Sequence, residues 1–282
     1  MSSNVGAIPR IGATATKRSS RRRINAPRVL ALGYLALLLA APVAMIMYRT
    51  FEDGITPVID SLTTAEAQHA LWLTFLMVII AVPLNTVFGV VMALLMVRKR
   101  FPGKWILNAL IDLPFAVSPV IVGLALILAY GNNSAIGGWL LDHGIEVIFT
   151  PLGMILATIF VSLPFVVREV IPVLREIGTE QEEASETLGA NSWQTFWKVT
   201  LPAIRWGVAY GVVLTTARAL GEFGAISVVS GKLSGQTETL TLRVRERFDH
   251  FDMVGAYSAS MILAVMALAT LLAMNIFKKE DS

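Results

Sequence analysis

The chain has 282 residues, of which 55% are hydrophobic and only 15% are charged. This is more apolar surface than a soluble domain of this length usually buries, so the composition argues against a soluble fold and favours a protein embedded in a bilayer. Cysteine is absent, which excludes a disulfide framework and a thiolate metal site. The net charge of +3 does not indicate nucleic acid, because the basic residues are not spread along one face with aromatic residues between them.

The apolar residues fall into long runs separated by short polar segments. A membrane-spanning helix needs about 20 mostly apolar residues. Six windows meet this condition, at residues 29–48, 70–97, 105–130, 151–174, 206–230 and 254–277. The sequence therefore predicts an all-α, polytopic membrane protein whose six transmembrane helices occupy residues 29–277, with no soluble domain.

The two ends of the chain are polar. Residues 1–28 are rich in arginine and predict a disordered basic arm, and residues 278–282 predict a short tail. A secretory signal also begins with basic residues, but the apolar run after this arm exceeds the usual signal core, so a retained first helix is favoured. Lysine and arginine concentrate in the segments on the arm's side of the membrane, which places both termini in the cytoplasm.

A polar interval at residues 179–202 separates the fourth and fifth predicted helices, on the cytoplasmic side. Thr179 and Glu182 have the spacing of a capping box, in which hydroxyl and carboxylate satisfy the free amides of a helix start. Gly189 suits the left-handed residue that ends such a helix.

A second short helix is predicted inside the same interval. Asn191 and Gln194 can cap its start, and Leu201 with Pro202 is expected to stop it. By itself, this pair of capped helices is compatible with a docking element and equally with a solvated connector.

The predicted spans contain residues that bend or narrow a helix. Prolines inside a span remove a backbone hydrogen bond and kink the helix, either to line a cavity or to help packing. They are Pro83, Pro114, Pro119 and Pro164. In the fifth span, small residues recur along the helix and let a neighbouring backbone approach closely. They are Gly207, Gly211, Ala217, Gly221 and Ala225.

Three ionisable residues lie inside predicted spans: Asp112 in the third, and Arg218 and Glu222 in the fifth. Charges at this depth face an interior or a water-filled path and find partners. Arg218 and Glu222 can pair along one helix face, and Asp112 can instead meet Arg218 across helices. These residues either line a polar route, with Arg218 attracting an anion, or form a structural ion pair.

Motifs for enzymatic chemistry are missing from the sequence. The three histidines, His69, His143 and His250, are far apart and give no metal site, and there is no GxSxG elbow. Gly231 and Lys232 lack the other residues of a phosphate-binding loop. We therefore expect that the chain is not an enzyme, has no cofactor or metal of its own, and depends on a partner for any use of ATP.

The polar interval resembles the EAA loop of binding-protein-dependent ABC importer permeases. That loop has the pattern Glu-Ala-Ala, three residues, Gly, nine residues, Ile, one residue, Leu-Pro. This chain has the same spacing, and five of the pattern's residues are present: Glu183, Ala184, Gly189, Leu201 and Pro202. Ser185 stands in place of the second alanine, and Val199 stands in place of the isoleucine. The resemblance implies a type I importer permease fold and a coupling loop that docks on an ATPase subunit, centred on Glu182, Glu183, Ala184, Gly189, Leu201 and Pro202.

Longer strings extend the resemblance over most of residues 27–277. DLPFAVSPVIVGL, GGWL, PFVVREVIPVL and RALGEFGAISVVSG are similar to sulfate and thiosulfate importer permeases of the CysW type. The resemblance implies a heterodimer with a T-type permease, two ATPase subunits that bind ATP and magnesium, a periplasmic or extracellular sulfate-binding protein, and a place among the lipids of the cell membrane, the inner one in a Gram-negative cell. A molybdate or tungstate permease and an ion-coupled secondary transporter are the alternatives.

Overall fold

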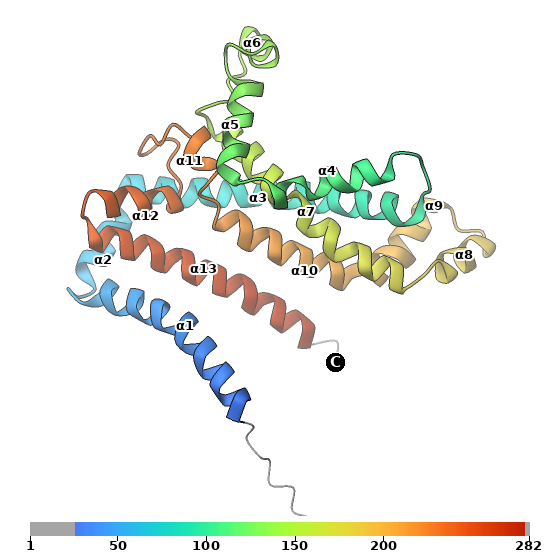
Figure 1. The fold of residues 1–282 in the computed structure, drawn as a ribbon, viewed down its shortest axis with the longest axis horizontal. Coiled ribbons are helices and arrows are strands. Elements are labelled where there is room, and N and C mark those ends of the chain that lie inside the picture. The colour runs from blue at the N-terminus through green and yellow to red at the C-terminus, as the bar shows by residue number, and fades with distance from the viewer. Residues whose placement is uncertain (1–25, 280–282) are drawn as a thin grey trace, which may run out of the picture. The chain divides into compact units, whose positions relative to one another are not determined.

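The computed structural model describes residues 26–279, and this part of the chain is helical, without strands. Figure 1 shows the arrangement of the helices. The helices are α1 (Ala26–Phe51), α2 (Thr56–Thr63), α3 (Ala65–Arg98), α4 (Lys104–Ala116), α5 (Pro119–Tyr130), α6 (Ala135–Asp142), α7 (Pro151–Glu176), α8 (Glu180–Thr187), α9 (Ser192–Thr195), the π-helix η1 (Phe196–Thr200), α10 (Leu201–Leu220), α11 (Ile226–Val229), α12 (Leu240–Asp249) and α13 (Met253–Lys279).

The chain divides into two compact units, one ending at Ala44 and the other beginning at Met45. The first unit contains most of α1, an apolar helix with Pro42 inside it. The predicted arm, residues 1–28, lies outside the described residues except for the three that begin α1, and the last three residues of the predicted tail lie outside them too.

Helix α7 forms the centre of the second unit, where it packs against α3 on one side and α10 on another (Figure 1). The close approach depends on glycine. A Cβ atom on Gly89 of α3 would lie 2.5 Å from Val166 Cβ of α7, and one on Gly211 of α10 would lie 2.8 Å from Val166 Cα. Real Cβ atoms do not approach so closely, so the small residues expected to narrow the fifth span do bring α10 against α7.

The two larger apolar clusters of the second unit lie along its long helices. One, near α11 and α12, includes Leu73, Met77 and Met154. The other, toward α8 and α9, includes Val166, Leu174 and Ile204. Each cluster draws on α3 and α7 together with shorter helices. These two long helices therefore connect the α11–α12 end of the unit rigidly to the α8–α9 end.

Within residues 26–279, four helices are long and apolar enough to cross a membrane, at Val29–Phe51, Ala65–Arg98, Pro151–Glu176 and Met253–Ala273. The predicted third span is a fifth candidate, but it is broken, because α4 and α5 meet at an angle of 114°. Pro119 explains the break, since it starts α5 and disfavours a helical conformation in the residue before it. Pro83, Pro114 and Pro164 do lie inside helices, as predicted.

The fifth predicted span is wrong in its second half, because α10 ends at Leu220 and residues 221–225 form turns before the short α11. Gly221 and Gly224 are poor helix formers, which favours an end at this point. Helix α10 has 20 residues but is not among the candidate spans, since Arg205 and Arg218 lower its hydropathy. The predicted count of six spans is therefore not confirmed.

Candidate functional site

Residues 179–202, here called the connecting loop, join α7 to α10 at one end of the second unit (Figure 1). Helix α8 ends as predicted at Gly189, whose φ is +88°. The amide of Gly189 donates to Glu186 O at 2.9 Å, and the amide of Ala190 donates to Ser185 O at 3.1 Å. These two bonds form a Schellman motif, which fixes the direction of the chain after α8.

The predicted caps of the connecting loop have opposite outcomes. Asn191 and Gln194 form a complete capping box at the start of α9, so that prediction is confirmed. The capping box at Thr179 is wrong, because Thr179 has a helical backbone conformation and its hydroxyl caps no amide. Instead, that hydroxyl donates to Glu183 Oε1 at 2.6 Å.

Leu201 and Pro202 do not stop the second helix, as the sequence suggested. The chain passes from α9 through the π-helix η1 into α10, with the amide of Leu201 donating to Phe196 O. Pro202 is the second residue of α10 and follows η1 without an intervening turn. The connecting loop is therefore continuous with α10, and a hydrogen bond of 2.6 Å between Ser185 and Thr195 also ties α8 to α9.

Arg98, the last residue of α3, anchors the connecting loop. Its guanidinium donates to Leu174 O at 3.1 Å and to Gly178 O at 2.6 Å, and its Nε lies 2.9 Å from Glu182 Oε2. Glu182 Oε1 also accepts from the Thr200 hydroxyl at 2.8 Å. Both charged side chains are largely buried, with 16% and 18% exposed. Glu182 thus joins the ends of α3 and α7 to α8 and η1.

The sequence pattern predicted a place for Glu182 in the loop and none for Arg98. The one local signal was that Arg98 directly follows a long apolar run. Its partners are 76 to 84 residues away along the chain, so no spacing rule could find them.

The other side of the connecting loop faces outward. Glu183, Ala184 and Gly189 are exposed, and the apolar side chains of Leu188 and Trp193 are 88% and 70% exposed. A substituent on Gly189 would meet nothing within 4 Å. Exposed large apolar residues on a rigid element indicate an interaction surface. Leu201 is partly buried and Pro202 is exposed, at the junction with α10.

The charged residues predicted inside spans fall into two pairs. Arg218 Nη1 lies 2.6 Å from Glu222 Oε2, so the predicted pair is formed, although Glu222 stands beyond the end of α10. Asp112 does not meet Arg218. It pairs with Arg168 of α7, whose Nε donates to Asp112 Oδ1 at 2.7 Å and whose Nη2 donates to Asn108 Oδ1 at 2.9 Å. The three candidate residues therefore belong to two separate places.

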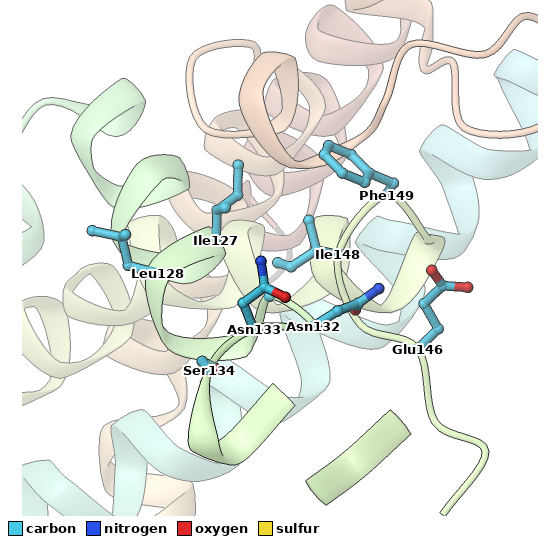
Figure 2. A pocket seen from close by; sticks show the side chains of 9 residues that line it. Ile127, Leu128, Asn132, Asn133, Ser134, Glu146, Ile148 and Phe149 are labelled. Atoms are coloured by element: carbon cyan, nitrogen blue, oxygen red, sulfur yellow. The ribbon is translucent and has the colours of Figure 1, made fainter. Parts of the chain in front are cut away.

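A pocket of about 430 Å³ lies between the end of α5, the start of α6 and the segment that precedes α7 (Figure 2). Asn132, Asn133 and Glu146 lie beside apolar walls that include Ile127 and Ile148. A carboxylate and no cation among its lining residues make this pocket a poor match for an anion. No group of three or more residues that could hold a metal ion occurs within residues 26–279.

Several apolar helices of spanning length and one broken pair indicate a multi-pass membrane protein. The chain belongs to the family described as binding-protein-dependent transport system inner membrane component, which matches residues 85–279. The family is one of membrane components of transport systems, so this chain acts in transport and not as an enzyme.

The chain is 49% identical to the sulfate transport system permease protein CysW of Synechocystis sp., over 89% of this chain and 91% of that one. It is 37% identical to the sulfate transport system permease protein CysT of Escherichia coli, over 91% of this chain and 94% of that one. A solved bacterial alginate ABC transporter in complex with its periplasmic protein has a TM-score of 0.74 at 16% identity, over 89% and 93% of the two chains. That likeness shows a shared fold.

Proposed function

We propose that this chain is the W-type permease subunit of an ATP-driven importer for sulfate and thiosulfate. The strongest support is its identity to the CysW relative over nearly the whole of both chains. In this proposal α10 is also a span, the fifth in chain order, which completes the six, and both termini lie in the cytoplasm. The protein resides in the cell membrane, the inner one in a Gram-negative cell. The partners are a T-type permease, two ATPase subunits that bind ATP and magnesium, and a sulfate-binding protein outside the membrane.

The connecting loop is the docking element for the ATPase. Its exposed side, with Glu183, Ala184, Leu188 and Gly189, offers a compact surface to the partner. Its other side is fixed by the Arg98–Glu182 pair. Because that pair and Thr200 tie α8 to α3, α7 and η1, a displacement of α8 by the ATPase moves several long helices together. Rigid-body motion of this kind is how alternating access is driven.

Uptake in a cell that lacks its own oxyanion permeases tests the proposal. The chain is expressed with its T-type partner, ATPase and binding protein, and uptake of radiolabelled sulfate, thiosulfate and molybdate is measured. Sulfate and thiosulfate uptake that stops when the ATPase is inactivated is expected. Uptake of molybdate alone would favour a molybdate permease. Uptake that survives ATPase loss but collapses with the ion gradient would favour a secondary transporter.

The assembly is tested separately by a pull-down from membranes. Affinity purification of this chain is expected to recover an ATPase and a second, different permease. Recovery of this chain as a homodimer with an ATPase would contradict the proposed pair and favour the molybdate alternative.

A further inference from the structure

The two helix breaks of the second unit lie against each other. One break separates α4 from α5 before Pro119, and the other is the turn at residues 221–225 between α10 and α11. A Cβ atom on Gly224 would lie 2.8 Å from Pro119 Cβ, and one on Gly123 would lie 2.8 Å from Ala225 O. Two segments of irregular backbone from two different predicted spans therefore meet without room for another side chain.

Irregular backbone at membrane depth is tolerated only where it is buried in protein or lines a water-filled cavity. Glu222, in the second break, is buried, with 2% of its surface exposed. Its Oε1 accepts from the amide of Ala225 at 2.8 Å, and its main-chain oxygen accepts from the Thr241 hydroxyl at 2.8 Å. These contacts hold the carboxylate in one place, so Glu222 is a fixed support for the arginine it pairs with.

Arg218 is held on one side only. Its Nη1 contacts Glu222 Oε2 at 2.6 Å, and 29% of the side chain is exposed. A guanidinium has five N–H donors in a planar fork. Within the described part of the chain, no partner other than Glu222 is found for Arg218. Arg218 therefore presents an oriented cation with unused donors beside the meeting point of the two breaks.

Arg168, unlike Arg218, uses most of its guanidinium donors within the protein. Its Nε and Nη2 both donate to the Asp112 carboxylate, and Nη2 also donates to Asn108. Two of its three nitrogens are thus committed to one carboxylate and a neighbouring amide, as in a bidentate structural pair. Arg168 fixes α4 against α7, whereas Arg218 retains donors for a ligand.

We infer that Arg218, positioned by Glu222, is a transient binding station for the tetrahedral oxyanion on its way through the permease, an inference that rests on the proposed function. Arginine suits such an anion because its planar fork matches two oxygens of the same group. The neighbouring carboxylate partly cancels the arginine's charge. This is useful in a conduction path, because a station must bind strongly enough to admit the ion and weakly enough to release it.

Reconstituted complexes in proteoliposomes test the station. The full complex with its binding protein is assayed for uptake of radiolabelled sulfate, and rates are expressed per assembled complex. For Arg218→Gln, the loss of a charge-assisted hydrogen bond should lower the maximal rate about 10- to 100-fold. The KM for sulfate should stay unchanged, since the binding protein captures the substrate first. An unchanged maximal rate would overturn the inference.

The double variant Arg218→Gln with Glu222→Gln separates a ligand role from a structural one. It removes both charges, so no buried carboxylate is left unpaired and the fold is less disturbed. A structural pair predicts that the double variant recovers the wild-type rate, which would overturn the inference. A binding station predicts that it remains as slow as Arg218→Gln.

A matched control is the neutral pair Asp112→Asn with Arg168→Gln, which should leave the maximal rate of assembled complexes close to the wild-type value. A loss of maximal rate as large as that of Arg218→Gln would show that the effect is not specific to Arg218 and would overturn the inference. Failure of the wild-type complex to take up sulfate at all would overturn the proposed function, and the inference with it. Normal uptake by the Arg218/Glu222 double variant overturns the inference alone.

Discussion

Arg98 in the last turn of α3 and Arg218 in the last turn of α10 each pair with a glutamate, but the two arginines make different contacts. The guanidinium of Arg98 contacts Glu182 and two main-chain carbonyl oxygens, at Leu174 and Gly178. The guanidinium of Arg218 contacts one carboxylate oxygen of Glu222. In the first pair both side chains are largely buried, whereas in the second the glutamate is buried and the arginine is partly exposed.

The difference separates an arginine that holds structural elements together from an arginine that can bind a ligand. An arginine that satisfies carbonyl oxygens at a helix end stabilises local geometry, because those oxygens have no partner inside the helix. An arginine held by one oxygen has donors left over for something that arrives. We therefore expect substitutions around Arg98 to change stability and coupling, and substitutions of Arg218 to change the rate of transport.

The largest effect on stability is expected for Arg98→Ala. It leaves the Glu182 carboxylate without its cation in a partly buried site, and breaking such a pair costs about 3 kcal/mol or more. Thermal unfolding of the purified complex measures this loss. Arg100→Ala is the matched control, because Arg100 is exposed two residues further on. Equal stability of the two variants would show that the Arg98–Glu182 pair does not stabilise the packing of α3, α7 and α8.

A smaller effect is expected for Thr200→Val, which keeps the shape of the side chain and removes the hydroxyl that donates to Glu182. Loss of a hydrogen bond to a charged group costs about 1.5 kcal/mol. Because Arg98 still neutralises Glu182, the loop should stay in place while its tie to α10 weakens. The number of ATP molecules hydrolysed per sulfate imported should rise. An unchanged ratio would mean that this tie does not transmit motion.

Gly189→Ala should destabilise the connecting loop by about 1 kcal/mol, because φ is +88° and a Cβ atom is disfavoured there. Gly144→Ala is the matched control, since its φ is +78° and it too has nothing within 4 Å. Both variants should insert into the membrane, but only the Gly189 variant should uncouple ATP hydrolysis from uptake. The bulkier Gly189→Trp variant sharpens this contrast, and normal uptake by it would contradict the docking role.

The smallest effect concerns a third pair, Arg243 with Glu238, whose closest atoms are 3.4 Å apart. Burial raises the pKa of Glu238 above its usual range. A carboxyl with a raised pKa in the folded state favours folding when protonated, and this contribution is lost as the pH rises through that pKa. Hydrogen exchange of α12 should therefore slow as the pH falls from neutral toward the pKa of Glu238, after correction for intrinsic rates. Glu238→Gln should abolish this dependence, and its persistence would assign it to another group.

Local features of this chain could be predicted from the sequence because their causes are local. The apolar runs predicted α1, α3, α7 and α13, since hydropathy acts on each window alone. Gly189 and the Asn191 cap were also predictable, because a turn or cap is formed by residues within a few positions. The pattern from Glu183 to Pro202 indicated the family for the same reason.

Tertiary structure decided the features that depend on which helices are neighbours. The partners of Arg98 are 76 to 84 residues away, and Arg168 reaches Asp112 across 56 residues, so no spacing rule identifies them. Pro202 suggested a stop, yet η1 carries the chain into α10. The apolar run at residues 206–230 suggested one helix, yet it breaks where Gly224 packs on Pro119. The sequence by itself determined the four long apolar helices and the cap at Asn191, because those preferences lie in neighbouring residues. Only the packing of helices determined which charges meet, because each charge pairs with the partner that the fold brings within reach.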